Sequence, residues 1–177
     1  AAAIEEAAGD SEDPAFATSI AYTGSNYFVK AAAIGGTVRG SSEDVDTYGY
    51  NLSGNAQLWQ GGSINASYTN GAGIGSYFVF GGADVLGNDA IRSEGLTLSI
   101  SQQVNKWNFG IGYGLRDIDA GIAGSTEELE TVHLTANYQV RENTTTGIEY
   151  ITGKREVFGQ AGSVRADRIQ ASVQFNF

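Results

Sequence analysis

Alternation of apolar and polar residues is the feature that most limits how this chain of 177 residues can fold. In residues 168–177 every odd position is apolar and every even position is polar. A period of two places the apolar side chains on one face of a β-strand and the polar side chains on the other. Residues 48–58, 107–116 and 132–140 follow the same pattern, with glycine on the second face of 107–116. The chain is therefore predicted to be all-β, with strands that have two unlike faces.

Five weaker segments complete a set of about nine predicted antiparallel strands, and no segment has the pattern of an amphipathic helix. The weaker strands are predicted at residues 15–22, 27–39, 63–68, 94–103 and 145–155. The connections alternate in length: 23–26, 59–62, 104–106 and 141–144 are short, whereas 40–46, 69–93, 117–128 and 156–167 are long. Short turns at one end and long loops at the other are typical of a transmembrane antiparallel β-barrel of the bacterial outer membrane.

Composition excludes several other classes of protein. There is no Cys, so disulfide scaffolds and thiolate metal sites are excluded. The net charge of −10 argues against nucleic acid as a partner. Charged residues make up 17% of the chain, below the roughly 25% of soluble domains. No apolar run is long enough for a transmembrane helix.

The polar face of the predicted strands carries Asn, Gln, Ser, Thr and Gly rather than Lys, Glu and Asp, which suits a wet lumen better than a solvated exterior. Aromatic residues gather at strand ends beside the short turns, as expected of the girdle where lipid meets headgroups. The alternative is that they are core aromatics of a soluble sandwich. These residues are Tyr22, Tyr27, Trp59, Trp107, Tyr138, Phe175 and Phe177.

Strand counting predicts that the chain is part of a larger barrel. The short turns should face the periplasm, together with the C-terminus, which ends in the terminal Phe typical of bacterial outer-membrane barrels. Counting back, residues 1–14 become the remnant of an extracellular loop, and residues 15–177 the barrel strands. Because single-chain bacterial barrels have an even number of strands, nine strands imply a miscount or the C-terminal half of a larger porin. An open sheet edge is not tolerated in lipid, so a companion chain should carry the N-terminal strands.

The last predicted hairpin resembles that of DcaP-like porins. In that family a GxEYxxGxRE stretch precedes a Gly- and Asp-rich loop and an R-[IV]-Q-x-S strand that ends in Phe. The matching residues are Gly147, Glu149, Tyr150, Gly153, Arg155, Glu156, Arg168, Ile169, Gln170 and Ser172. Residues 71–77 resemble the family's G-x-G-x-G-R-Y loop start, although Ser76 stands where Arg is frequent.

The resemblance implies a homotrimeric porin with about 16 strands per subunit, in the outer membrane of a Gram-negative bacterium. It implies passive diffusion of small, often anionic solutes such as dicarboxylates. The constriction loop, which usually follows an early strand, would then lie outside this chain.

Several charged residues are predicted to line the pore. Arg116, Arg155 and Arg168 fall on the polar face near the extracellular strand ends, and Arg39 is a fourth candidate. Guanidinium groups at a pore mouth attract carboxylates and offer them bidentate contacts. The competing interpretation is that these arginines pair with acids, with Glu149 a plausible partner for one of them, and only hold the wall. The face of Lys30 stays ambiguous, because the segment 27–34 is apolar in both registers.

Other features give weaker signals. His133, the single His, is predicted to face the lumen as a hydrogen-bonded wall residue. With no second His and no Cys, neither catalysis nor a metal site is expected, and no cofactor is implied. Acidic runs in the predicted loops either are solvated or bridge divalent cations to lipopolysaccharide. The loop 69–93 is too apolar for a free loop and should fold into the barrel mouth or over a neighbouring subunit, or form a short extra strand.

Two alternatives stay open at this point. One is a complete outer-membrane barrel of about eight strands, filled by side chains, with an adhesive or structural role. The other is a secreted soluble sandwich that binds sugar. Solubility without detergent would favour the sandwich.

Overall fold

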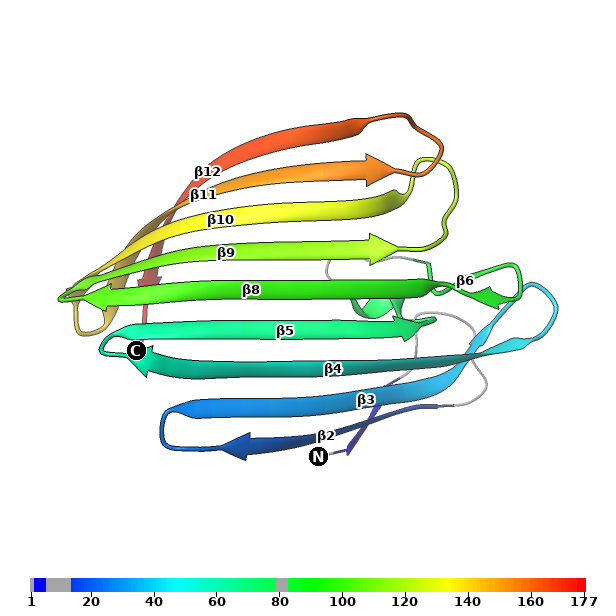
Figure 1. The fold of residues 1–177 in the computed structure, drawn as a ribbon, viewed down its shortest axis with the longest axis horizontal. Helices are drawn as coiled ribbons and strands as arrows, with labels where there is room; N and C mark the ends of the chain where they lie inside the picture. Colours follow the sequence, from blue (N-terminus) through cyan, green and yellow to red (C-terminus); the bar gives the residue numbers. More distant parts are fainter. Residues whose placement is uncertain (1, 6–13, 79–82) are drawn as a thin grey trace.

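The computed structural model describes residues 2–5, 14–78 and 83–177, and most of them lie in one antiparallel sheet. Figure 1 shows the long strands side by side, with β12 bending behind the rest so that the sheet curves. The strands are β1 (Ala2–Glu5), β2 (Ala15–Thr23), β3 (Tyr27–Arg39), β4 (Asp44–Trp59), β5 (Gly62–Ala72), β6 (Val85–Leu86), β7 (Asp89–Ala90), β8 (Arg92–Val104), β9 (Trp107–Ile118), β10 (Thr126–Arg141), β11 (Thr144–Val157) and β12 (Ser163–Phe175); the 3₁₀ helix η1 spans Gly75–Tyr77.

The strand order confirms the predicted all-β meander. Ten strands follow one another in chain order, β1-β2-β3-β4-β5-β8-β9-β10-β11-β12, while β6 and β7 pair separately. In the described part of the chain β1 and β12 remain at opposite edges, so the sheet is open. Residues 2–5, 14–78 and 83–177 form no second large sheet that could pack against the first as in a sandwich, and their ten-stranded sheet is not a closed eight-stranded barrel.

Strand β1 is an addition to the nine predicted strands. Ala2–Glu5 pair with the first residues of β2, where sequence reasoning expected an extracellular loop over 1–14. The other predicted loop residues, 6–13, lie outside the described residues. The division of the chain into a loop remnant and barrel strands therefore stays a prediction.

Most strands extend further than predicted at one end of the sheet, the end that carries the longer connections. Strand β10, for example, begins at Thr126 rather than at 132, and β4 begins at Asp44 rather than at 48. Backbone pairing continues past the alternating segment because hydrogen bonds do not require unlike faces. A barrel strand needs only about 9–11 residues to cross a membrane, so 16-residue strands such as β10 have a portion that can be wet on both faces.

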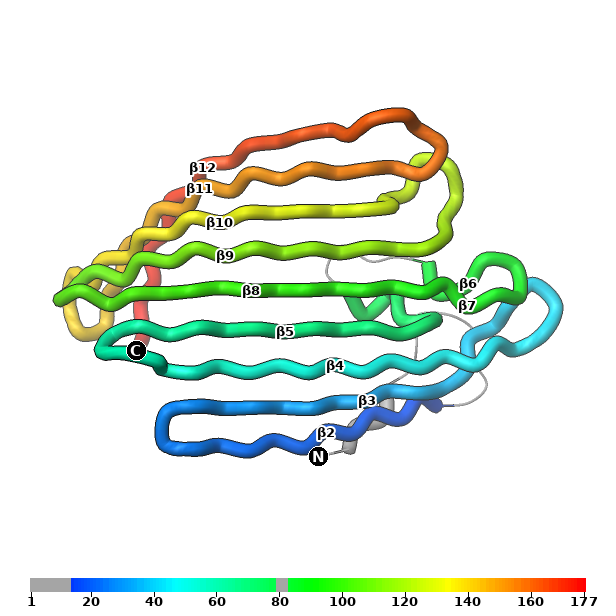
Figure 2. Tube along the Cα trace, viewed as in Figure 1, coloured from blue at the N-terminus to red at the C-terminus, as the bar shows by residue number. Residues whose placement is uncertain are grey.

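Figure 2 shows the two kinds of connection, with tight turns at the other end of the sheet. We call these the short-turn end and the long-loop end. Two-residue loops join β4 to β5, β8 to β9 and β10 to β11. Asn105 and Gly61 have positive φ angles of 54° and 75°, as tight hairpin turns require. This local chemistry explains why the short turns were predicted at the right places.

Register defines two unlike faces. Cross-strand partners share a face, so the row Ser99, Gly112, His133, Ile151 and Arg168 lies on one side of β8–β12. We call this side the polar face and the opposite side the apolar face. Large hydrophobic side chains such as Ile20, Leu52 and Ile111 are more than half exposed on the apolar face. Exposed apolar surface on this scale marks a face built for contact with lipid or protein.

The buried residues gather at the long-loop end. Ile74, Ile91, Ser93, Arg116 and Ile118 are all buried there. They lie where the segment between β5 and β8 folds back onto the polar face. Elsewhere in the described part of the sheet, the large hydrophobic side chains are partly or fully exposed.

Candidate functional site

The polar face carries a trough along β9. Gly110, Gly112 and Gly114 form its floor, and they alternate with apolar residues that point to the other face. Hydroxyl groups of β8 and β10 form its walls, in cross-strand register with the glycines. A cavity of about 430 Å³ lies here; the wall residues on this face are Thr97, Ser99, Ser101, Thr131, His133 and Thr135. Because three successive positions on this face of β9 have no side chain, the trough has room for solute or water.

His133 and Glu149 form the main charged contact of the polar face at mid-strand. His133 Nδ1 lies 2.9 Å from Glu149 Oε1. Gln170 Nε2 donates to the other carboxylate oxygen. The interpretation that Glu149 pairs with an arginine is wrong in this structure, because its carboxylate contacts His133 and Gln170 and no ion pair joins it to an arginine among the described residues. Register alone does not decide this, since His133 and Arg168 are both diagonal neighbours of Glu149.

Arg116 is buried at the end of the trough. Its side chain is 6% exposed and follows the glycine floor along β9. Its guanidinium carbon lies 5.6 Å from the ring centroid of Phe78, a cation–π contact. No ion pair joins Arg116 to an acid among the described residues. The competing interpretation of a wall arginine paired with an acid therefore does not describe Arg116.

Arg155 and Arg168 also lie on the polar face, as predicted. Arg155 is paired across the strands with Leu129, which is itself opposite Arg116. Its Nε donates to Thr126 Oγ1 at 2.9 Å. Lys30, whose face was ambiguous from sequence, is opposite Ser53 and so joins the polar face nearer the short-turn end.

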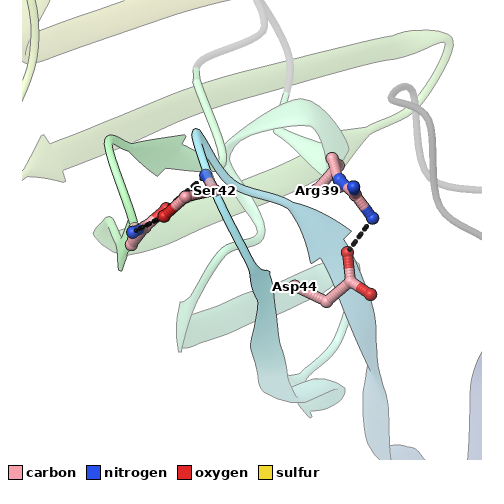
Figure 3. Close-up of polar contacts among 4 residues, drawn as sticks. Arg39, Ser42 and Asp44 are labelled. Atoms are coloured by element: carbon pink, nitrogen blue, oxygen red, sulfur yellow. Dashed lines mark hydrogen bonds and ion pairs between the residues drawn. The ribbon is translucent and has the colours of Figure 1, made fainter.

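Arg39 does not join this set. It is opposite Asp44 in register, and the alternation of β3 and β4 places both on the side of Tyr48 and Tyr50. Arg39 forms a 3.3 Å ion pair with Asp44 at the end of the β3–β4 hairpin (Figure 3). The prediction of Arg39 as a pore-lining residue is corrected accordingly. Sequence reasoning missed this because β3 begins with apolar residues on both faces and gives no phase.

The loop predicted over 69–93 turns inward and also forms a short hairpin. Ile74, η1 and Phe78 lie against the polar face, and Figure 1 shows η1 behind β5 and β8, on the side toward which β12 bends. Strands β6 and β7 then pair at the long-loop end. Asn88 in their turn accepts from the backbone N–H of Ser42 and donates to its Oγ (Figure 3). Residues 79–82 of this loop lie outside the described residues.

The predicted aromatic residues gather at the short-turn end of the apolar face. The Trp107 and Tyr138 rings are cross-strand partners with centroids 4.8 Å apart. Tyr22 and Tyr27 are 5.8 Å apart across the β2–β3 hairpin. Trp59, Phe175 and Phe177 are exposed as well. The geometry is that of a girdle, while its contact with lipid stays a prediction.

Several acids predicted in loops lie instead in the extended strands. Asp117 and Glu128 are two of these acids, and together with Glu94, which was predicted to begin a strand, they are successive cross-strand partners on the apolar side at the long-loop end. Lys154 pairs with Glu156 and Glu128 close by, at 2.7 and 3.6 Å. These charges explain how a chain of net charge −10 has a polar face with mainly basic residues.

Two other kinds of site are absent from the described residues. These residues hold no group of three or more His, Cys, Asp or Glu side chains that is arranged to bind a metal ion. They include no helix with the length and hydropathy of a membrane span.

Comparison with solved structures defines the fold class. The outer membrane channel DcaP of Acinetobacter baumannii matches with a TM-score of 0.78 at 16% identity, over 99% of this chain and 54% of that chain. A porin refined at 1.8 Å resolution matches with a TM-score of 0.59 at 19% identity, over 93% of this chain and 52% of that one. No protein-family model matches the chain, and no curated protein sequence matches it.

The chain therefore has the β-barrel fold of outer-membrane porins. It spans about half the length of both matched structures. The resemblance to DcaP-like porins that the last hairpin indicated is confirmed at the level of the fold.

Proposed function

We propose that this chain forms part of the wall of an outer-membrane porin, through which small hydrophilic solutes, preferentially anions, diffuse passively. The observation that carries the proposal is the division between the two faces. One face combines a glycine-floored trough with hydroxyl groups and arginines, and the other exposes aliphatic and aromatic side chains. A barrel wall between water and lipid requires this arrangement.

The anion preference rests on the charges of the polar face. Lys30, Arg116, Arg155 and Arg168 are the basic groups that the register places there. The opposing carboxylate of Glu149 is held by His133 and Gln170. Selectivity follows the charges that line a pore rather than the net charge of the chain, so the acids outside this face do not reverse the preference. Dicarboxylates are one class of solute that fits two or more spaced guanidinium groups.

The proposal extends to location and partners. The apolar face, with its aromatic end, would contact outer-membrane lipid, and the acidic long-loop end would approach lipopolysaccharide through divalent cations. The open edges at β1 and β12 require further strands to close the barrel. A companion segment, in the same polypeptide or another, would supply them, and three barrels would assemble into a homotrimer.

We propose a channel rather than an enzyme. A hydrolytic triad would need a serine beside His133, and the candidate across the trough is Ser99. Ser99 Oγ accepts from Asn65 Nδ2 at 3.2 Å, and the described hydrogen bond of His133 goes to Glu149 rather than to Ser99. Absence of hydrolysis of fatty-acyl esters by the purified protein would agree with this proposal.

The test of the proposed function is ion selectivity in planar bilayers. The full-length protein and an Arg155→Gln/Arg168→Gln variant are compared by reversal potential across a KCl gradient. We expect anion preference in the parent protein and a shift toward cations in the variant. Arg165→Gln is the matched control, because Arg165 lies on β12 but on the opposite face from Arg168. Absence of channels, or an equal shift in the control, contradicts the proposal.

A further inference from the structure

Three buried polar atoms lie at the long-loop end of the polar face. Ser93 Oγ, Arg116 Nε and Arg116 Nη2 are the buried side-chain polar atoms without a hydrogen-bond partner in the described part of the chain. Ser93 is 2% exposed and Arg116 is 6% exposed. Arg116 lies opposite Gly95 in register, and Ser93 precedes Gly95 by two positions, so the two side chains are diagonal neighbours on one face.

The two unpartnered nitrogens of Arg116 form one edge of the guanidinium group. The N–H bonds of Nε and Nη2 on this edge are parallel, so they can donate together to two oxygens of one anion. The Ser93 hydroxyl can donate a third hydrogen bond. Buried donors left in this state cost free energy, and a buried guanidinium without a counter-charge costs more.

No carboxylate of the described residues neutralises this charge. Glu94 and Asp117, which are adjacent in sequence to the two site residues, point to the opposite face because side chains alternate along β8 and β9. Glu94 is held there by Tyr68 and Asn70. The site therefore combines a buried guanidinium and a hydroxyl donor with no counter-charge from the described residues, and an oxyanion is the group that matches these donors.

Phe78 covers Arg116. The ring centroid lies 5.6 Å from the guanidinium carbon. A Cβ at Gly95 would lie 2.6 Å from Phe78 Cε1, so glycine at this position makes room for the ring. The ring face offers partial compensation for the buried cation. It satisfies none of the three hydrogen-bonding atoms, because an aromatic ring is at most a weak acceptor.

We propose that Arg116 and Ser93 form an oxyanion-binding site covered by Phe78, and that the ring must move aside before a carboxylate or phosphate group binds. This inference rests on the proposed anion preference and names the groups that would bind the anion. Phe78 also lines a cavity of about 370 Å³ whose other walls include Lys30 and Asn51, so there is space beside the ring. Anion binding at Arg116 therefore depends on movement of the Phe78 ring, whereas the exposed Arg155 is accessible without such a movement.

The test is chemical modification of arginine by phenylglyoxal, followed by peptide mass spectrometry on the full-length protein in detergent. We expect Arg116 to react slowly in the parent protein and at least tenfold faster in Phe78→Ala. Inorganic phosphate or acetate should slow the reaction at Arg116 in that variant. Ser93→Ala on the same background should weaken this protection several-fold. The exposed Arg165, on the apolar side, is the internal control and should react at one rate throughout.

The outcomes separate the two oxyanion classes and the two proposals. Protection by phosphate alone or by acetate alone identifies the group that the site takes. Equal rates at Arg116 in the parent and in Phe78→Ala, or no protection by either anion, overturns the proposal. Phe78→Leu, which keeps an apolar side chain without a π face, replaces Phe78→Ala if the latter does not fold. Because the readout needs no transport, a failed bilayer experiment and a failed anion site are distinguishable.

Discussion

Truncation of Ile74 tests whether residues 74–78, which lie against the polar face, are held there by packing on the strands. Ile74 is 3% exposed and contacts the wall at two glycines. A Cβ at Gly49 would lie 3.0 Å from Ile74 Cδ1, and one at Gly71 would lie 2.7 Å from it. The side chain thus fills a space that exists only because these positions have no side chains. Ile74→Ala would empty that space and weaken the docking of η1 and Phe78.

The magnitude follows from the burial. Truncation of a buried Ile to Ala costs about 2–5 kcal/mol, and water entering from the polar face favours the lower end. A loss of about 2 kcal/mol raises the opening equilibrium of the segment roughly 30-fold. The free energy of global unfolding should change little, because the strands of the sheet are held together by their own backbone hydrogen bonds.

Amide hydrogen exchange is the appropriate assay. The backbone N–H of Ser76 donates to Asp84 Oδ1 at 2.8 Å, and that of Tyr77 donates to the carbonyl of Ile74 at 3.1 Å. Their exchange in Ile74→Ala should accelerate by about the same 30-fold factor, which measures local opening. Ile122→Ala makes the same truncation at a loop residue that is 69% exposed, and should leave these amides unchanged. Unchanged exchange in Ile74→Ala would refute the packing argument.

Three further predictions concern the trough, the aromatic end and the charge of the polar face. Gly112→Ala should fold normally, because the added Cβ would lie 3.7 and 3.8 Å from Ser99 Cβ and His133 Cβ. Gly112→Trp should lower the single-channel conductance, because the indole ring fills the trough. Equal conductance in the two variants would contradict this prediction. Trp107→Ala removes ring contacts with Tyr138 and Phe109 at 4.8 and 5.7 Å and should cost about 1–2 kcal/mol, seen as a lower temperature for the heat-induced gel shift of the barrel. Glu149→Gln should strengthen anion preference in reversal-potential measurements, because it removes the carboxylate beside His133, and Glu156→Gln on the apolar side is the control that should not.

Much of the site could be predicted from sequence because it follows the period of the strands. The alternation within β9–β12 assigns each residue of these strands to one of two faces. It predicts one shared face for Arg116, Arg155, Arg168 and His133, and the strand register confirms this. The aromatic residues beside the short turns followed from the same phase. The partner of Glu149 could not be predicted in this way, because the carboxylate contacts His133 while Arg168, which is also a diagonal neighbour, is not its partner.

Alternation by itself determined the all-β class, the number of long strands and, outside β3, the assignment of most strand residues to two faces. Each strand has a polar environment on one side and an apolar environment on the other. The alternation that encodes these two sides is therefore local, and it is repeated in every strand. Tertiary structure alone decided where the strands end, the face of Arg39, the inward path of Ile74 and the cover of Phe78 over Arg116. These features depend on contacts between residues far apart in the chain. Buried apolar residues such as Val38 and Ile118 lie on the polar face at the long-loop end, so the alternation of the strands does not mark those contacts in the sequence.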